Sequence, residues 1–177
     1  MPSPRTPLPR LAVLALAALL CLPAAAQESV RETHGDWTVL CNDTQPDACV
    51  MQQTGQGNEG NDLLDVRVRK LEGVTTEEGE RVPAAIQIAA PLGVLLRGGV
   101  RVRVDGNEER GAPFEICVQN GCIVRDLMSE AFLEEMKRGI TARMTIVSPR
   151  EGEVTSDISL DGFTAAFNAL PAAQGRR

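Results

Sequence analysis

The chain has 177 residues and a formal net charge of −6 at pH 7, from 18 basic and 24 acidic side chains. This length suits one ordinary domain behind a short leader. The acidic balance argues against nucleic acid or an anionic membrane as a partner, unless basic residues cluster in the fold. They alternate with other residues instead, as in Arg101 and Arg103, so we expect solvated strand faces and no nucleic-acid partner.

Residues 1–26 have the pattern of a secretory signal peptide. Arg5 and Arg10 precede an uncharged apolar stretch over 11–22, and three alanines at 24–26 follow it. This stretch is too short to span a bilayer. We therefore expect cleavage after Ala26, a mature chain of net charge −8 in the periplasm or outside the cell, and no transmembrane segment after cleavage.

The first part of the mature chain predicts a β-hairpin. Runs of β-favouring residues cover 36–41 and 48–54, and a turn-forming cluster at 42–47 joins them. Trp37, the single tryptophan, could be a binding hot spot, but we expect it to anchor the core of the first strand. The segment before it, which holds His34, is expected to be mobile.

The middle of the chain predicts further strands. Leu64, Val66 and Val68 alternate with polar residues, an acidic turn is expected over 73–83, and residues 84–90 form another apolar run. Val100, Val102 and Val104 also alternate with polar residues, and the turn residues 105–107 follow. We expect residues 114–118 to return as the partner strand of 100–104.

Four cysteines remain after the expected cleavage: Cys41, Cys49, Cys117 and Cys122. An even number in an oxidising compartment predicts two disulfides, with three possible connectivities. Local pairing of 41 with 49 and of 117 with 122 is the first choice. Crossed pairing would close longer loops and stabilise the chain by somewhat more than 4 kcal/mol per bridge, so energy alone does not exclude it.

The geometry around residues 117–122 leaves two alternatives. If residues 118–121 form a four-residue loop, the cysteines face one another at its base, at the separation a disulfide requires. If Asn120 and Gly121 alone form a tight type I′ turn, Cys122 faces Gln119 and the geometry is poorer.

A zinc site or a redox-active dithiol could also use these cysteines. Zinc sites often include histidine, and His34 is the only one in the chain. A catalytic dithiol usually has two intervening residues at a helix N-terminus, whereas four residues separate Cys117 from Cys122 and the flanks favour strand. We therefore expect structural disulfides, with redox chemistry as the alternative.

The C-terminal third predicts a helix, two strands and a second helix. Asp126 or Ser129 can cap a helix that ends before Gly139, and residues 140–148 and 154–160 favour strands. Phe163, Ala166, Phe167 and Leu170 have helical spacing and should cover a sheet. The fold class expected is all-β, a compact antiparallel β-sandwich or barrel-like domain over 27–171 with one or two short helices and a disordered tail at 172–177.

Several motifs together resemble the invasion-associated locus B family of exported bacterial proteins. They are Gly35-Asp36-Trp37 with Cys41, Cys49-Val-Met-Gln52, Pro91-Leu-Gly93, Gly99 with Asp105-Gly106, Phe114-x-x-Cys117-x-x-x-Gly121-Cys122 and Leu160-x-Gly162-Phe163-x-x-Ala166. The resemblance covers residues 33–170. It implies a small periplasmic or secreted all-β protein from a Gram-negative bacterium, in a family linked in some pathogens to host-cell entry, and it implies no catalytic residues.

A search for catalytic chemistry finds little. A nucleophilic triad would have to use His34, and neighbouring acids such as Glu108 and Glu109 should be solvated. The acidic and amide side chains between Asp105 and Glu109 are spaced like part of a calcium loop, but a hairpin turn explains them more simply. We therefore expect no catalytic residue, no cofactor and no metal.

The function expected from sequence is that of an exported, non-enzymatic interaction or accessory protein, associated with virulence or envelope function. Its partner would be an unknown envelope or host protein, met by a strand edge or loop surface. The alternatives are a periplasmic thiol-disulfide enzyme or other envelope enzyme that uses Cys117 and Cys122, and a small-ligand binding module.

Overall fold

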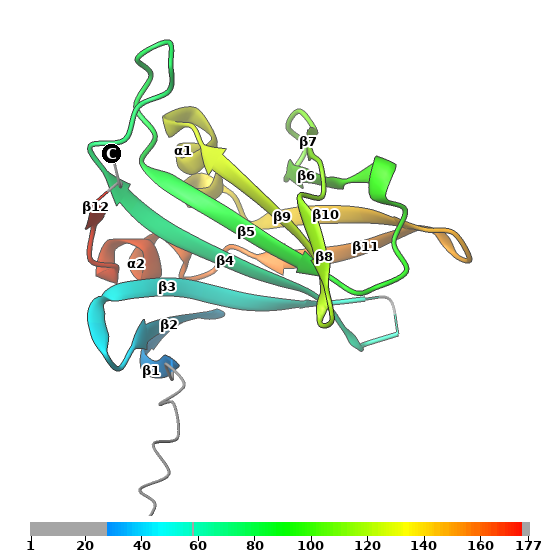
Figure 1. The fold of residues 1–177 in the computed structure, drawn as a ribbon, viewed down its shortest axis with the longest axis horizontal. Coiled ribbons are helices and arrows are strands. Elements are labelled where there is room, and N and C mark those ends of the chain that lie inside the picture. The colour runs from blue at the N-terminus through cyan, green and yellow to red at the C-terminus, as the bar shows by residue number, and fades with distance from the viewer. Residues whose placement is uncertain (1–27, 58, 175–177) are drawn as a thin grey trace, which may run out of the picture.

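The computed structural model describes residues 28–57 and 59–174, which form two β-sheets packed face to face, with two short helices (Figure 1). The larger sheet has the strand order β1 (Glu28–His34), β2 (Trp37–Asn42), β3 (Gln45–Gln56), β4 (Asp62–Glu72), β5 (Ala84–Ala90), β9 (Gly121–Met128) and β8 (Ile116–Val118). The smaller sheet has the order β11 (Gly152–Ser159), β10 (Thr141–Ser148), β6 (Val100–Val104) and β7 (Arg110–Ala112). Neighbouring strands in both orders are antiparallel.

Alternation of side chains along the strands builds the core between the sheets. On β4, Leu64, Val66 and Val68 point inward and are buried, as the sequence pattern predicts. The smaller sheet contributes buried side chains from β6, β10 and β11, including Val104, Met144 and Ile158. The fold is a β-sandwich and not a closed barrel, because the strands divide into two separate sheets. The predicted all-β class is confirmed.

Helix α1 (Glu130–Arg138) begins and ends where the sequence predicts. The hydroxyl of Ser129 accepts a hydrogen bond from the backbone N–H of Phe132, which caps the N-terminus. Gly139 ends the helix with φ at −74°, so no left-handed conformation requires glycine there. A β-carbon at Gly139 would instead lie 2.5 Å from Val104 and 2.8 Å from Leu160, so close packing excludes a side chain.

Helix α2 (Phe163–Ala169) packs on β1, β2 and β4 of the larger sheet. Its apolar stripe is buried, as predicted, and the ring of Phe163 meets that of Trp37 edge to face with 5.1 Å between centroids. The indole Nε1 of Trp37 donates a hydrogen bond to the carbonyl of Ser159 at 2.9 Å. Trp37 is therefore a core residue, which excludes it as a surface hot spot.

Three segments differ from the sequence predictions. Residues before Trp37, expected to be mobile, form the edge strand β1 against β2. Residues 114–118 do not pair with β6; β7 takes that place, and β8 crosses to pair with β9 in the larger sheet. Within the tail expected to be disordered, β12 (Ala173–Gln174) pairs in parallel with Leu71 and Glu72 of β4.

Candidate functional site: the open end of the sandwich

Two connections cross between the sheets at the end of the molecule away from α2 (Figure 1). The first, residues 91–99, leads from β5 to β6 and contains the 3-10 turn η1 (Leu96–Gly98). The second, residues 113–115, leads from β7 to β8. They lie close where the first ends and the second begins, since Gly99 approaches the carbonyl of Ala112.

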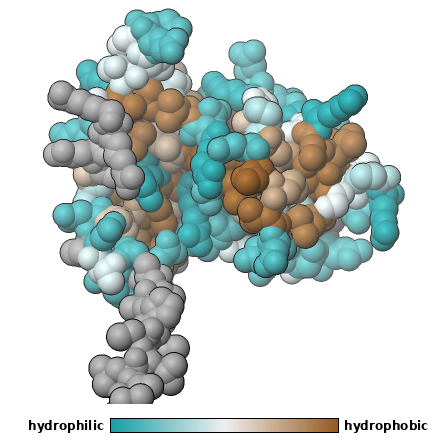
Figure 2. Space-filling view, viewed as in Figure 1, coloured by the Kyte–Doolittle hydropathy of each residue, from teal (hydrophilic) through white to brown (hydrophobic). Residues whose placement is uncertain are grey.

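Large aliphatic side chains remain exposed on these connections and on β8. We define the apolar patch as the five residues that are 45% to 58% exposed there: Leu92, Leu95, Leu96, Ile116 and Val118. Figure 2 shows hydrophobic side chains gathered over β8 and the connection that carries η1. Such a set presents a few hundred Å² of apolar surface, the size at which patches on a monomer are often functional.

Local structure explains why the patch faces outward. Cys122 points into the core, and β8 pairs Cys117 directly with it, so Ile116 and Val118 point to the outer face of the sheet. In the first connection, the backbone N–H of Leu95 donates to the carbonyl of Val147 at 2.7 Å and ties η1 to β10. The patch is therefore built on backbone that both sheets hold in place.

The disulfide Cys117–Cys122 closes the hairpin beneath this patch, with 3.9 Å between the two Cα atoms. Val118 and Gly121 are themselves paired, so the turn consists of Gln119 and Asn120. Neither predicted turn is right in detail. The cysteines face one another as the four-residue loop would require, but the loop is only two residues long and is not centred on Asn120-Gly121.

The second disulfide, Cys41–Cys49, joins β2 and β3 in direct register. Both cysteines are buried in the core, and the guanidinium of Arg31 from β1 lies 3.7 Å from the sulfur of Cys41. Cys117, in contrast, is exposed. The structure thus pairs all four cysteines locally, which is the connectivity preferred from sequence.

A groove of about 390 Å³ adjoins the apolar patch. Its walls are the β3–β4 loop, the start of the first connection and the β10–β11 hairpin. We call it the end groove. Leu92 belongs both to this groove and to the patch, so the two surfaces are continuous.

Charged side chains on the strand faces are mostly paired with one another. Arg67 pairs with Glu28 and Asp65, Arg125 with Glu115, and Arg143 with Asp157. The hydrogen bond and charge of Arg143 lower the pKa of Asp157, and Lys137 likewise lowers the pKa of Glu134. The arginines on alternating positions thus lie in mixed-charge strand faces. Where Arg67, Arg69 and Arg125 line one hollow of the larger sheet, Glu28 lies among them and pairs with Arg67.

Residues considered for catalysis or metal binding have structural surroundings. His34 Nε2 lies 3.0 Å from a carboxylate oxygen of Glu32 on an exposed edge strand. The Asp105 carboxylate accepts hydrogen bonds from the backbone N–H groups of Ile140 and Thr141, which ties the β6–β7 turn to β10. Within the described ranges, no three His, Cys, Asp or Glu side chains gather as a metal site, and no helix is long and apolar enough to cross a membrane.

The family model for the invasion-associated locus B (IalB) protein matches residues 37–171, from the core tryptophan to two residues past α2. The chain belongs to the invasion-associated locus B family. The family resemblance seen in the sequence motifs is thereby confirmed.

Individual IalB relatives match along most of their length. The invasion protein B homolog of Brucella abortus (strain 2308) is 30% identical over 161 residues, which cover 85% of this chain and 84% of the relative. Invasion protein B of Bartonella bacilliformis is 27% identical over 158 residues, covering 86% and 80%. The crystal structure of invasion associated protein B from Bartonella henselae superposes with a TM-score of 0.61 at 25% identity, covering 80% of this chain and 96% of that one.

The IalB motifs noted in the sequence lie largely at structural positions. Gly162 shows why: its φ is +80°, and a β-carbon there would overlap the carbonyl oxygen of His34. The apolar patch was missed from sequence. A signal was present in Leu95-Leu96, a leucine pair between glycines outside any periodic strand, but sequence alone does not say whether such a pair is covered.

Proposed function

We propose that this IalB-family chain is an exported, non-enzymatic binding protein that holds a protein partner on its apolar patch. The observation that carries the proposal is the gathering of five half-exposed aliphatic side chains on a rigid, disulfide-closed end of the sandwich. Because these side chains are already about half buried, covering the rest at an interface yields about half of the roughly 1.5–3 kcal/mol of full burial for each, before the costs of association. The names of the relatives support a role connected with invasion.

Export and the absence of catalysis are parts of the same proposal. The signal-peptide pattern lies in residues 1–26, outside the described residues, and the two local disulfides suit an oxidising compartment. The four cysteines are joined in disulfides, so a thiol nucleophile would require prior reduction. Intact mass of the protein from the producing cell tests export, and a mature chain that begins at Gln27 is expected.

Position-specific crosslinking tests the binding role. A photoreactive amino acid at Leu96, within the patch, should yield a crosslinked product of discrete mass in living cells. The same amino acid at Ile140, which is 78% exposed outside the patch, should yield none. The product should disappear when Leu95→Asp is added. Equal crosslinking from both positions, or none from either, would show that the patch has no specific partner.

A further inference from the structure

We propose that the end groove binds an extended segment of the partner protein that carries an apolar side chain next to a lysine or arginine. This inference rests on the proposed function and specifies which chemistry the partner brings beside the apolar patch.

The floor of the groove is apolar and comes from both sheets. Leu63 on β4 and Val94 on the first connection are half-buried, and Ile146 and Val154 contribute from the β10–β11 hairpin. A volume of about 390 Å³ is at the small end of the range for ligand pockets. It therefore suits one or two side chains of a peptide better than a large cofactor.

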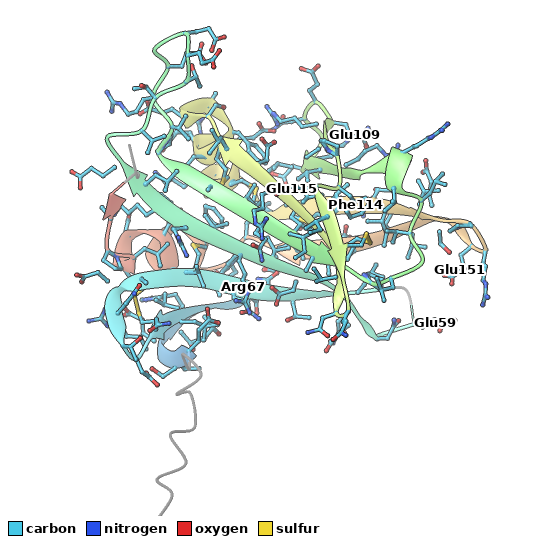
Figure 3. The ribbon with its side chains drawn as sticks, viewed as in Figure 1. Glu59, Arg67, Glu109, Phe114, Glu115 and Glu151 are labelled. Carbon is cyan, nitrogen blue, oxygen red and sulfur yellow. A yellow bond between two sulfur atoms is a disulfide. The ribbon has the colours of Figure 1, made fainter. Side chains whose placement is uncertain are left out.

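The rim of the groove carries two carboxylates on opposite loops. Glu59 lies on the β3–β4 loop and Glu151 on the β10–β11 turn, both exposed and on the same side of the molecule (Figure 3). Neither forms an ion pair with any residue that the structure describes, although Arg150 is next to Glu151 in the chain. Glu109 and Glu115, which Figure 3 also labels, are each paired with arginine.

Hydrogen bonds to backbone N–H groups hold both loops that carry these carboxylates. The N–H of Gly57 donates to the carbonyl of Asn61 at 2.8 Å, which closes the first loop. The hydroxyl of Ser148 accepts from the N–H of Glu151 at 3.3 Å in the second. The rim is therefore largely formed before a ligand arrives, which reduces the entropic cost of binding.

Charge complementarity points to a cationic occupant. Two unpaired carboxylates over an apolar floor favour a ligand that is apolar where it enters the groove and positively charged where it leaves. The net charge of the chain has the same sign as the rim, so it adds to the attraction of a basic segment and repels anionic lipid. A second copy of the chain would bring the same excess of negative charge and fits less well.

Synthetic peptides test the proposal directly. The probe is the fluorescein-labelled peptide GSLKLKSG, with GSLELESG and GSSKSKSG as matched peptides that change either the charge or the apolar side chains. Fluorescence anisotropy against the full mature protein should show saturable binding of the first peptide. Binding of the serine peptide should be more than about tenfold weaker, since the apolar burial is lost.

Protein variants separate the groove from the net charge. Glu59→Gln with Glu151→Gln should weaken binding of GSLKLKSG roughly two- to tenfold. Glu77→Gln with Glu78→Gln removes two exposed, unpaired carboxylates from the turn at the opposite side of the molecule and should leave binding unchanged. Glu59→Lys with Glu151→Lys should reverse the peptide preference toward GSLELESG.

Three results would overturn this inference. They are the absence of saturable binding by GSLKLKSG, equal weakening by the two glutamine pairs, and a homodimer in sedimentation that the Glu59→Gln, Glu151→Gln variant dissociates. The last would assign the groove to a second copy. Leu96 does not line the groove, so persistence of its crosslink alongside failed peptide binding would reject the groove proposal alone.

Discussion

Each end of the sandwich has a hairpin closed by a disulfide, and the two ends differ in what covers that hairpin. At the covered end, which holds α2, Trp37 and Cys41–Cys49, the helix seals the sheet and both cysteines are buried. At the open end, which holds the apolar patch and Cys117–Cys122, the aliphatic side chains stay half-exposed and Cys117 is exposed. Apolar residues therefore stabilise the fold at one end and remain available for contact at the other.

The largest expected effect is on stability at the covered end. Trp37→Ala removes a fully buried ring, its edge-to-face contact with Phe163 and its hydrogen bond to Ser159. We expect a loss of roughly 3–5 kcal/mol in the free energy of unfolding. Leu95→Ala, at the open end, should change it by less than about 0.5 kcal/mol. Urea denaturation measures both, and similar losses would mean that the ends do not differ in the way described.

A pair of glycines sharpens the comparison through the backbone. Gly162 and Gly93 both have positive φ, +80° and +90°, but only Gly162 has no room for a β-carbon, since His34 occupies the space. Gly93→Ala should cost about 1–2 kcal/mol from the left-handed conformation alone. Gly162→Ala should cost roughly 3 kcal/mol or more, because the β1–β2 turn must also shift. Equal losses in thermal or urea unfolding would contradict the close approach.

The disulfides should differ in accessibility more than in energy. Each closes a short loop, with sequence separations of 8 and 5, and should contribute roughly 2 kcal/mol. Cys117 is exposed, whereas Cys41 and Cys49 are buried beneath Arg31, so dithiothreitol should reduce Cys117–Cys122 first under native conditions.

Alkylation of the released thiols followed by peptide mass analysis measures that order. Samples in mild urea supply the control. Partial unfolding of the covered end should expose Cys41–Cys49, so that dithiothreitol reduces the two disulfides at similar rates. Reduction of Cys41–Cys49 first, with Trp37 fluorescence still native, would reverse the assignment of the covered and open ends.

The smallest expected effect is electrostatic and belongs to neither end. Arg143 pairs with Asp157 on the exposed face of the smaller sheet and lowers the pKa of that carboxyl. The contribution of this ion pair to the free energy of unfolding is therefore fully present above the ordinary Asp pKa of 3.8. It is lost as the pH falls through the lowered pKa of Asp157. Asp157→Asn should shift the denaturation midpoint slightly at pH 7 and not at all at the lowest pH where the fold persists. A larger shift would mean that surface pairs hold the sandwich more strongly than their exposure indicates.

Most of the strands could be predicted because period-two alternation is a local property. The alternation of Leu64, Val66 and Val68, and of the valines in β6, marks strands whatever lies around them. The same locality placed α1, since Ser129 caps through its own neighbours. The partner of a strand is not local. The hairpin pattern predicts that residues 114–118 pair with β6, whereas in the structure β8 pairs with β9 of the larger sheet.

The candidate site was harder to predict than the fold. Leu92, Leu95 and Leu96 do not stand out in a chain with so many apolar residues, and their exposure arises because no helix among the described residues covers them. The end groove joins Glu59, Leu92 and Glu151 from three separate parts of the chain. No spacing in the sequence relates them, because their proximity follows from how the sheets stack.

By itself, the amino-acid sequence determined the all-β class, the family and the residues that bury, since each depends on periodicity or on motifs that lie within a few residues of one another. Only the tertiary structure decided which strand edges pair, how short the Cys117–Cys122 turn is, and which apolar residues stay uncovered. The physical reason is that exposure and long-range pairing depend on the competition of distant segments for the same surface. Here α2 covers Trp37, and among the described residues no helix covers the apolar patch.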